Sequence, residues 1–75
     1  MILEDGVAKC IFEPRGDNGL EGYQLNDEYK YQLMVQNLPS GPAKYYRIYL
    51  SDDYYETCGR YVFGCYFKRS EGSNG

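Results

Sequence analysis

The sequence predicts a mainly β domain, in which a small antiparallel sheet of about four strands forms an SH3-like roll with one short C-terminal helix. Short runs of alternating apolar and polar residues are separated by glycine and proline, the pattern of half-buried strands joined by turns. Ten of the 75 residues are tyrosine, which strands favour. Full or partial closure into a roll hides the edges of a sheet. A flat four-stranded sheet with the helix packed on one face is the alternative.

The first strand is expected at residues 7–12, an apolar-rich run that ends before Pro14. Residues 1–6 are expected to form a loose arm, and residues 14–19 a loop rich in glycine. Residues 20–27 are expected to be irregular, with three side chains packed inward: Leu20, Tyr23 and Leu25. The inner face of the first strand is either Ala8, Cys10 and Phe12 or Val7 and Ile11.

Alternation is strongest in the middle of the chain and predicts three further strands. In residues 28–36, four side chains fall on one face: Tyr29, Tyr31, Leu33 and Val35. A turn at residues 37–42, with two prolines and a glycine, precedes the next strand at residues 44–50. The strand at residues 54–58 follows a tight turn, so the last two strands are expected to form a hairpin.

The hydrophobic period changes after residue 58. Four side chains have the spacing of one helical face: Val62, Phe63, Tyr66 and Phe67. We expect one or two helical turns within residues 59–68, because Gly64 weakens a longer helix. A final strand is the alternative. A single domain is therefore expected over residues 1–69, followed by a flexible tail at residues 70–75.

Cysteine usage and hydropathy predict a reduced, soluble, intracellular protein. Three cysteines are an odd number, unlike the denser, even set of a small secreted domain, so we expect thiols that lie mostly in the core: Cys10, Cys58 and Cys65. Neither a signal peptide nor an apolar run near the roughly 20 residues of a membrane span is found, so no membrane contact is expected. Without histidine or a Cys-x-x-Cys pair, no metal or other cofactor is expected.

The sequence lacks the residues of common enzyme sites. Without histidine it has neither a Ser-His nor a Cys-His pair. The adjacent carboxylates at residues 27–28 and 52–53 fall in predicted turns, where solvated charges are the simpler interpretation. No glycine-rich phosphate loop leads from a strand into a helix. We therefore expect no catalytic residues and a protein that acts by binding a partner.

The predicted strand at residues 44–50 carries the side chains that best fit a partner-binding surface. Its aliphatic face is expected to point inward, which turns Tyr45, Arg47 and Tyr49 outward. Tyrosine and arginine are enriched among residues that dominate binding energy. Three acidic residues nearby are expected to add charge complementarity: Asp52, Asp53 and Glu56. Packing among the tyrosines and the arginine stem, which stabilises a sheet without any partner, is the alternative for each single tyrosine.

Other kinds of partner stay open. Tyrosines with an arginine between them also resemble the base-stacking platform of single-stranded nucleic-acid-binding sheets. The net charge of −3 disfavours direct nucleic-acid binding. An inhibitor of a host defence enzyme that mimics nucleic acid is a further alternative, and it needs carboxylates spaced like phosphates. A partner strand could also add to an open sheet edge at residues 7–12.

Three segments carry a family resemblance: GLEGY at residues 19–23, YYRIY at 45–49, and YYETC at 54–58, followed by Phe63, Tyr66 and Phe67. With the length and acidity of the chain, they resemble small lytic-phage proteins, in particular RNA-polymerase-binding transcription regulators of the Xanthomonas phage type. The resemblance implies a protein in the cytoplasm of an infected bacterium, bound to RNA polymerase at the β′ N-terminal region and the β flap. Such a regulator displaces the sigma factor, blocks initiation and promotes read-through of terminators. The chain itself is expected to be a monomer.

Overall fold

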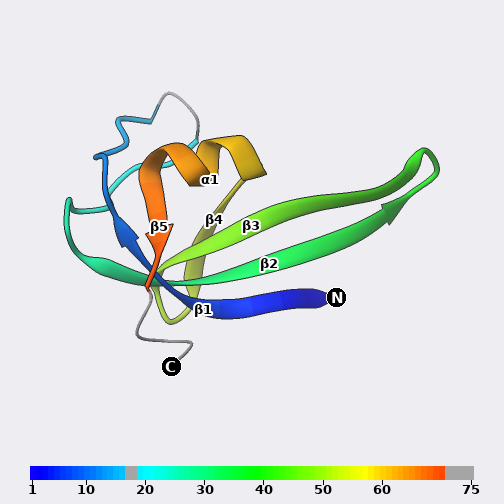
Figure 1. Cartoon of the computed structure of the whole chain (residues 1–75), viewed down its shortest axis with the longest axis horizontal. Coiled ribbons are helices and arrows are strands. Elements are labelled where there is room, and N and C mark those ends of the chain that lie inside the picture. Colours follow the sequence, from blue (N-terminus) through cyan, green and yellow to red (C-terminus); the bar gives the residue numbers. More distant parts are fainter. Residues whose placement is uncertain (17–18, 71–75) are drawn as a thin grey trace.

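The computed structural model describes residues 1–16 and 19–70. Five strands and one helix follow each other as β1 (Ile2–Cys10), β2 (Glu28–Leu38), β3 (Gly41–Ser51), β4 (Tyr54–Cys58), α1 (Arg60–Tyr66) and β5 (Phe67–Arg69). The strands form one antiparallel sheet in the order β4-β3-β2-β1-β5, so that the last strand pairs beside the first (Figure 1). The chain thus returns to its N-terminal strand after crossing from one sheet edge to the other through α1.

The predicted fold class is confirmed: the protein is mainly β, with a small antiparallel sheet and one short C-terminal helix. The strand at residues 54–58 has the predicted bounds, and the two strands before it are each longer than predicted. The final segment forms both of the expected alternatives in succession, because α1 ends at Tyr66 and β5 begins at Phe67. The sheet has a fifth strand and is open, with β4 and β5 at opposite edges, rather than closed into the predicted roll.

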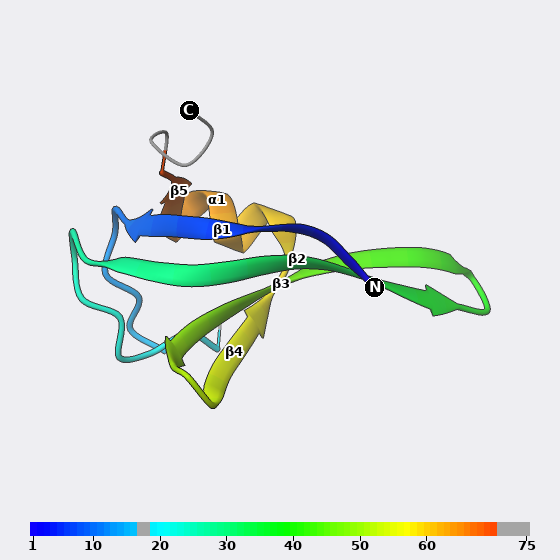
Figure 2. The same cartoon turned by 90° about the horizontal axis from the view of Figure 1, so that it is seen from below.

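The long β2–β3 hairpin extends past the rest of the sheet (Figures 1 and 2). On one side β1 pairs as far as Met34, and on the other β4 pairs as far as Tyr46. Between them, residues 36–43 form strand pairs only within the hairpin in the described part of the chain. Gly41 follows the turn with a φ of 124°, a conformation that glycine adopts without strain.

The N-terminal prediction is wrong in its bounds. Residues 1–6 are not a loose arm, because β1 begins at Ile2 and pairs with β2 from Ile2 to Lys9, with a register shift between Ile2 and Glu4. The strand ends at Cys10, and Phe12 lies beyond it, 63% exposed and stacked on Tyr66 at 5.7 Å between ring centroids. Ala8 and Lys9 pair with β2 on one side and β5 on the other, and Cys10 also pairs with β5, so the open edge expected at residues 7–12 does not exist at these positions.

The core lies between the inner face of the sheet, the β1–β2 loop and α1. It consists of ten buried residues: Ala8, Cys10, Leu20, Tyr23, Tyr31, Tyr46, Ile48, Cys58, Phe63 and Phe67. Leu20 and Tyr23 of the loop pack into the core as predicted, whereas Leu25 is half exposed. The Tyr23 hydroxyl donates to the Ile48 carbonyl at 2.7 Å. From α1, Phe63 stacks on Tyr46 with 3.9 Å between ring centroids and 4° between ring planes. Aromatic stacking therefore holds the helix on the sheet.

Three further predictions concern the cysteines, membrane crossing and the C-terminal tail. All three cysteines are free thiols, with Cys10 and Cys58 buried and Cys65 exposed. Among residues 1–16 and 19–70, no helix has the length and hydropathy needed to cross a membrane. Of the predicted tail, residues 71–75 lie outside the described residues.

Candidate functional site

The predicted orientation of β3 is observed. Tyr46 and Ile48 are buried in the core, while Tyr45, Arg47 and Tyr49 are half-buried on the opposite side of the sheet, here called the outer face. The register places Met34 opposite Tyr45 and Gln32 opposite Arg47. Both β2 residues are less than a tenth exposed, because the large side chains of β3 lie beside them.

Five side chains of the outer face form a packed group, here called the outer cluster: Lys30, Tyr45, Arg47, Tyr49 and Tyr55. The Arg47 guanidinium carbon lies 4.6 Å from the centroid of the Tyr55 ring, a cation–π arrangement. Tyr55 also packs on Tyr49 at 5.1 Å between centroids, and the Lys30 ammonium nitrogen lies 5.6 Å from the Tyr49 ring. The Tyr49 hydroxyl donates to Gln32 Oε1 at 3.3 Å. These contacts fix the rings before any partner arrives.

Arg47 carries an unsatisfied donor. Its Nε atom is buried and has no hydrogen-bond partner among the described residues. A buried N–H group without an acceptor costs free energy, which makes this position unusual in a folded protein. The rest of the guanidinium stacks on Tyr55, so the side chain is held in place by packing rather than by a carboxylate.

Basic residues gather on the outer face although the whole chain is acidic. Besides Lys30 and Arg47, the strand alternation places Lys9 of β1 and Lys68 of β5 on this side, directly opposite one another. Glu28 of β2 is paired with Lys9 on the other side. Like charges in register repel each other unless a counter-charge lies near. Asp5 of β1 also falls on this side, opposite Gln32, so the strands place four basic and two acidic side chains on the outer face, which is basic on balance.

The three predicted acidic residues do not lie on one surface. Asp52 and Asp53 lie in the β3–β4 turn, and Asp53 Oδ1 accepts a hydrogen bond from the Ser51 hydroxyl at 3.2 Å. Glu56 belongs to the inner side of β4, where its Oε1 accepts from the backbone N–H of Glu21 at 3.0 Å. Its other oxygen accepts from the Tyr54 hydroxyl at 3.2 Å. Glu56 therefore anchors the β1–β2 loop and lies away from the outer cluster.

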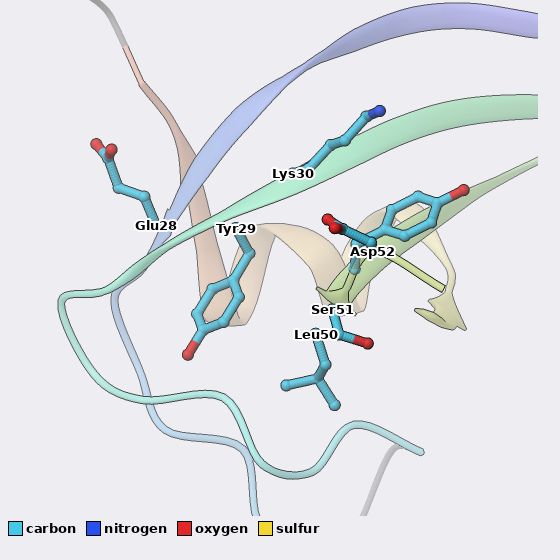
Figure 3. Close-up of a pocket in the computed structure, with 7 residues that line it drawn as sticks. Glu28, Tyr29, Lys30, Leu50, Ser51 and Asp52 are labelled. Atoms are coloured by element: carbon cyan, nitrogen blue, oxygen red, sulfur yellow. The ribbon is translucent and has the colours of Figure 1, made fainter. Parts of the chain in front are cut away.

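A pocket of about 380 Å³ borders the outer cluster at the end of the sheet where β2 begins and β3 ends. Seven residues line it: Glu28, Tyr29, Lys30, Tyr49, Leu50, Ser51 and Asp52. Figure 3 shows Lys30 pointing to one side of the strands, whereas Tyr29 and Leu50 point to the other. One predicted acidic residue, Asp52, is thus close enough to share a hollow with Tyr49. One cation, two carboxylates and two tyrosine rings therefore line this pocket at the rim of the outer face.

Sequence reasoning missed Lys30 and Tyr55 as members of the outer cluster. Lys30 was detectable, because it falls on the polar face of the predicted strand at residues 28–36. Tyr55 was not, because its register depends on a bulge: Ser51 pairs with Tyr54, but the next pair is Tyr49 with Tyr55, so Leu50 is the extra residue.

Within the described residues, no three cysteine, aspartate or glutamate side chains are grouped closely enough to hold a metal ion. Comparison with known proteins finds no family model, curated protein or solved structure that matches the chain. The site must therefore be interpreted from its own chemistry.

Proposed function

We propose that the chain is a non-enzymatic transcription regulator of a lytic phage that binds bacterial RNA polymerase in the cytoplasm of the infected host. One observation supports partner binding most directly: the outer cluster presents tyrosines and an arginine already packed in one arrangement. Arginine and tyrosine are enriched among residues that dominate binding energy. Side chains ordered in advance lose less conformational entropy when a partner binds.

The charge of the outer face indicates which kind of partner surface would be complementary to it. Four basic side chains against two acidic ones, Asp5 and Glu28, on this side of the sheet favour an acidic partner surface. Asp52 and Asp53, in the turn at the end of β3, lie at the rim and would contact basic groups there. The choice of RNA polymerase, with displacement of sigma and read-through of terminators, rests on the family resemblance.

The test measures binding of the chain to immobilised bacterial core RNA polymerase. Truncation of a hot-spot side chain costs 2 kcal/mol or more, so Tyr45→Ala and Arg47→Ala are each expected to weaken binding by about tenfold or more. Tyr61→Ala is the matched control, because Tyr61 is an 84% exposed tyrosine on α1. It removes the same ring and should leave the affinity unchanged.

Thermal unfolding of each variant separates lost binding from lost folding, since Arg47 also packs on Tyr55. Competition with sigma is scored in the same format, with the chain added before or after sigma. Absence of binding to core polymerase, or equal loss with Tyr61→Ala, refutes the proposal.

A single-stranded nucleic-acid binder is the second candidate, and the basic outer face favours it. Three of its tyrosines, at positions 45, 49 and 55, are at least partly exposed beside cations, as on base-stacking platforms. Filter binding of an unstructured oligonucleotide across a salt series distinguishes the two, because phosphate binding falls steeply with salt.

A further inference from the structure

A second hollow lies on the inner side of the sheet, at the root of the β2–β3 hairpin. Its volume is about 460 Å³, within the range of small-ligand sites. It is here called the root pocket, and its lining comes from four elements: Leu33 of β2, Lys44 and Tyr46 of β3, Arg60, Phe63 and Gly64 of α1, and Arg69 of β5. The outer cluster contributes no residue to it.

Three cations converge on the root pocket from three separate elements: Lys44, Arg60 and Arg69. Only Arg69 has an ion-pair partner, Glu4, and this is the only ion pair among residues 1–16 and 19–70. Lys44 and Arg60 are exposed and carry charges that no carboxylate of the described chain neutralises. In a chain with a net charge of −3, positive charges collected around one hollow repel each other, and an anion bound between them would remove that repulsion.

The floor of the root pocket is apolar and closely packed. The rings of Tyr46 and Phe63 are stacked and almost fully buried, and Leu33 packs against the same core. Arg69 is aimed by two neighbours, because its Nη2 donates to the Tyr46 hydroxyl at 2.8 Å and to Glu4 Oε1 at 3.2 Å. One of the three cations is therefore fixed, and the other two are free to close on a ligand.

Gly64 of α1 belongs to the lining of the root pocket. A Cβ atom placed there would meet no atom within 4 Å, so packing does not require glycine. Inside a helix glycine is less favourable than alanine by about 1 kcal/mol. The helix thus accepts a weaker residue at the position that faces the hollow.

We propose that the root pocket binds the phosphate group of a small ligand of the nucleoside monophosphate type. Arg60 and Lys44 donate to the phosphate oxygens, and the guanidinium of Arg60 can do so through two N–H groups. Leu33, which is partly exposed in the lining, offers an apolar contact to the remainder of the ligand. This site is separate from the outer cluster, and it does not depend on the proposed function.

The test is a titration of the ¹⁵N-labelled chain followed by two-dimensional NMR. Four probes are used: inorganic phosphate, adenosine monophosphate, adenosine without phosphate, and a 5′-phosphorylated trinucleotide. The phosphate-bearing probes should produce saturable shifts at the amides of Lys44, Arg60 and Gly64, whereas adenosine should produce none. Tighter binding of the trinucleotide than of the mononucleotide assigns the phosphate to a nucleic-acid end, and the reverse order assigns it to a free nucleotide.

Two double variants with the same change in charge complete the test. Lys44→Gln with Arg60→Gln should weaken binding of adenosine monophosphate by about threefold or more for each charge removed. Lys9→Gln with Lys68→Gln removes two cations from the outer face and should leave it unchanged, with both variants giving the spectrum of a folded chain. Equal weakening by the two pairs, or no saturable shift at about 10 mM of any phosphate probe, overturns the proposal.

Discussion

Arg69 in the last strand and Glu4 in the first strand form a two-point ion pair. Arg69 Nε lies 2.5 Å from Glu4 Oε2, and Arg69 Nη2 lies 3.2 Å from Glu4 Oε1. The Tyr31 hydroxyl donates to the same carboxylate, and Arg69 also reaches the Tyr46 hydroxyl. Four side chains from four strands therefore meet over the inner face, so the two ends of the described chain are joined through side chains as well as through the β1–β5 pairing.

This ion pair predicts a stability that depends on pH. The hydrogen bonds from Arg69, and then that from Tyr31, hold the pKa of Glu4 below its usual value of 4.5. A carboxyl group with a lowered folded-state pKa stabilises the fold above its unfolded-state pKa, and this contribution is lost as pH falls through the folded-state pKa. Glu4→Gln should lower the free energy of unfolding by about 0.5–1 kcal/mol at neutral pH, because the pair is partly solvent-screened.

Urea unfolding of the two proteins at neutral pH and at about pH 3 checks this, and the difference should shrink at the lower pH. Glu13→Gln is the control, since Glu13 is an exposed carboxylate outside the strands. A difference between wild type and Glu4→Gln that is as large in acid as at neutral pH would contradict the assignment.

Two glycines are expected to respond in opposite ways to alanine. Gly64→Ala should raise the free energy of unfolding by about 0.5–1 kcal/mol, because it improves helix propensity and meets no atom. Gly22→Ala should lower it by about 1–2 kcal/mol, because Gly22 has a φ of 97°, a left-handed conformation that strains a residue with a Cβ atom. Thermal or urea unfolding measures both variants, and effects of the same sign would show that one of the two backbone conformations is wrong.

The three thiols should differ in reactivity. Cys65 is exposed, whereas Cys10 and Cys58 are buried. Burial raises the pKa of Cys58 to about 12 and is the main cause of the raised pKa of Cys10, so both remain protonated at neutral pH. Because the thiolate is the reactive form, a disulfide reagent should modify Cys65 rapidly and the other two only after unfolding. The absorbance of the released thiol measures this, Cys65→Ser should abolish the fast phase, and a fast phase that survives would refute it.

The middle of the fold was predictable because its strands follow local rules. Residue types alternate with period two along β2, β3 and β4, and turn residues separate these strands, so the sequence pattern located them. The start of β1 was not predictable, since two features hide its alternation. Gly6 lies opposite Tyr31, where an added Cβ would be 3.2 Å from the ring, and a bulge at Leu3 shifts the register. A strand whose inner position is glycine shows no apolar face in its sequence.

The same reasoning explains the partial success at the candidate site. Tyr45, Arg47 and Tyr49 share one side of an unbroken strand, so their common orientation follows from period two. The bulge at Leu50 places Tyr55 beside Tyr49 and turns Glu56 inward. Counting back from a two-residue turn would pair Tyr55 with Leu50, on the other face. Bulges depend on tertiary packing, and here Leu50 packs near Gly22. A local sequence pattern therefore does not predict them.

The β2–β3 hairpin has a consequence for how the chain tolerates change. Its outer residues, 36–43, support no strand other than each other, and none of them belongs to the core. Substitutions, added residues or a chemical label near Ser40 therefore alter the reach of the hairpin without loosening the aromatic stack beneath α1. In this protein, the contacts that the hairpin tip makes and the stability of the core can therefore evolve separately.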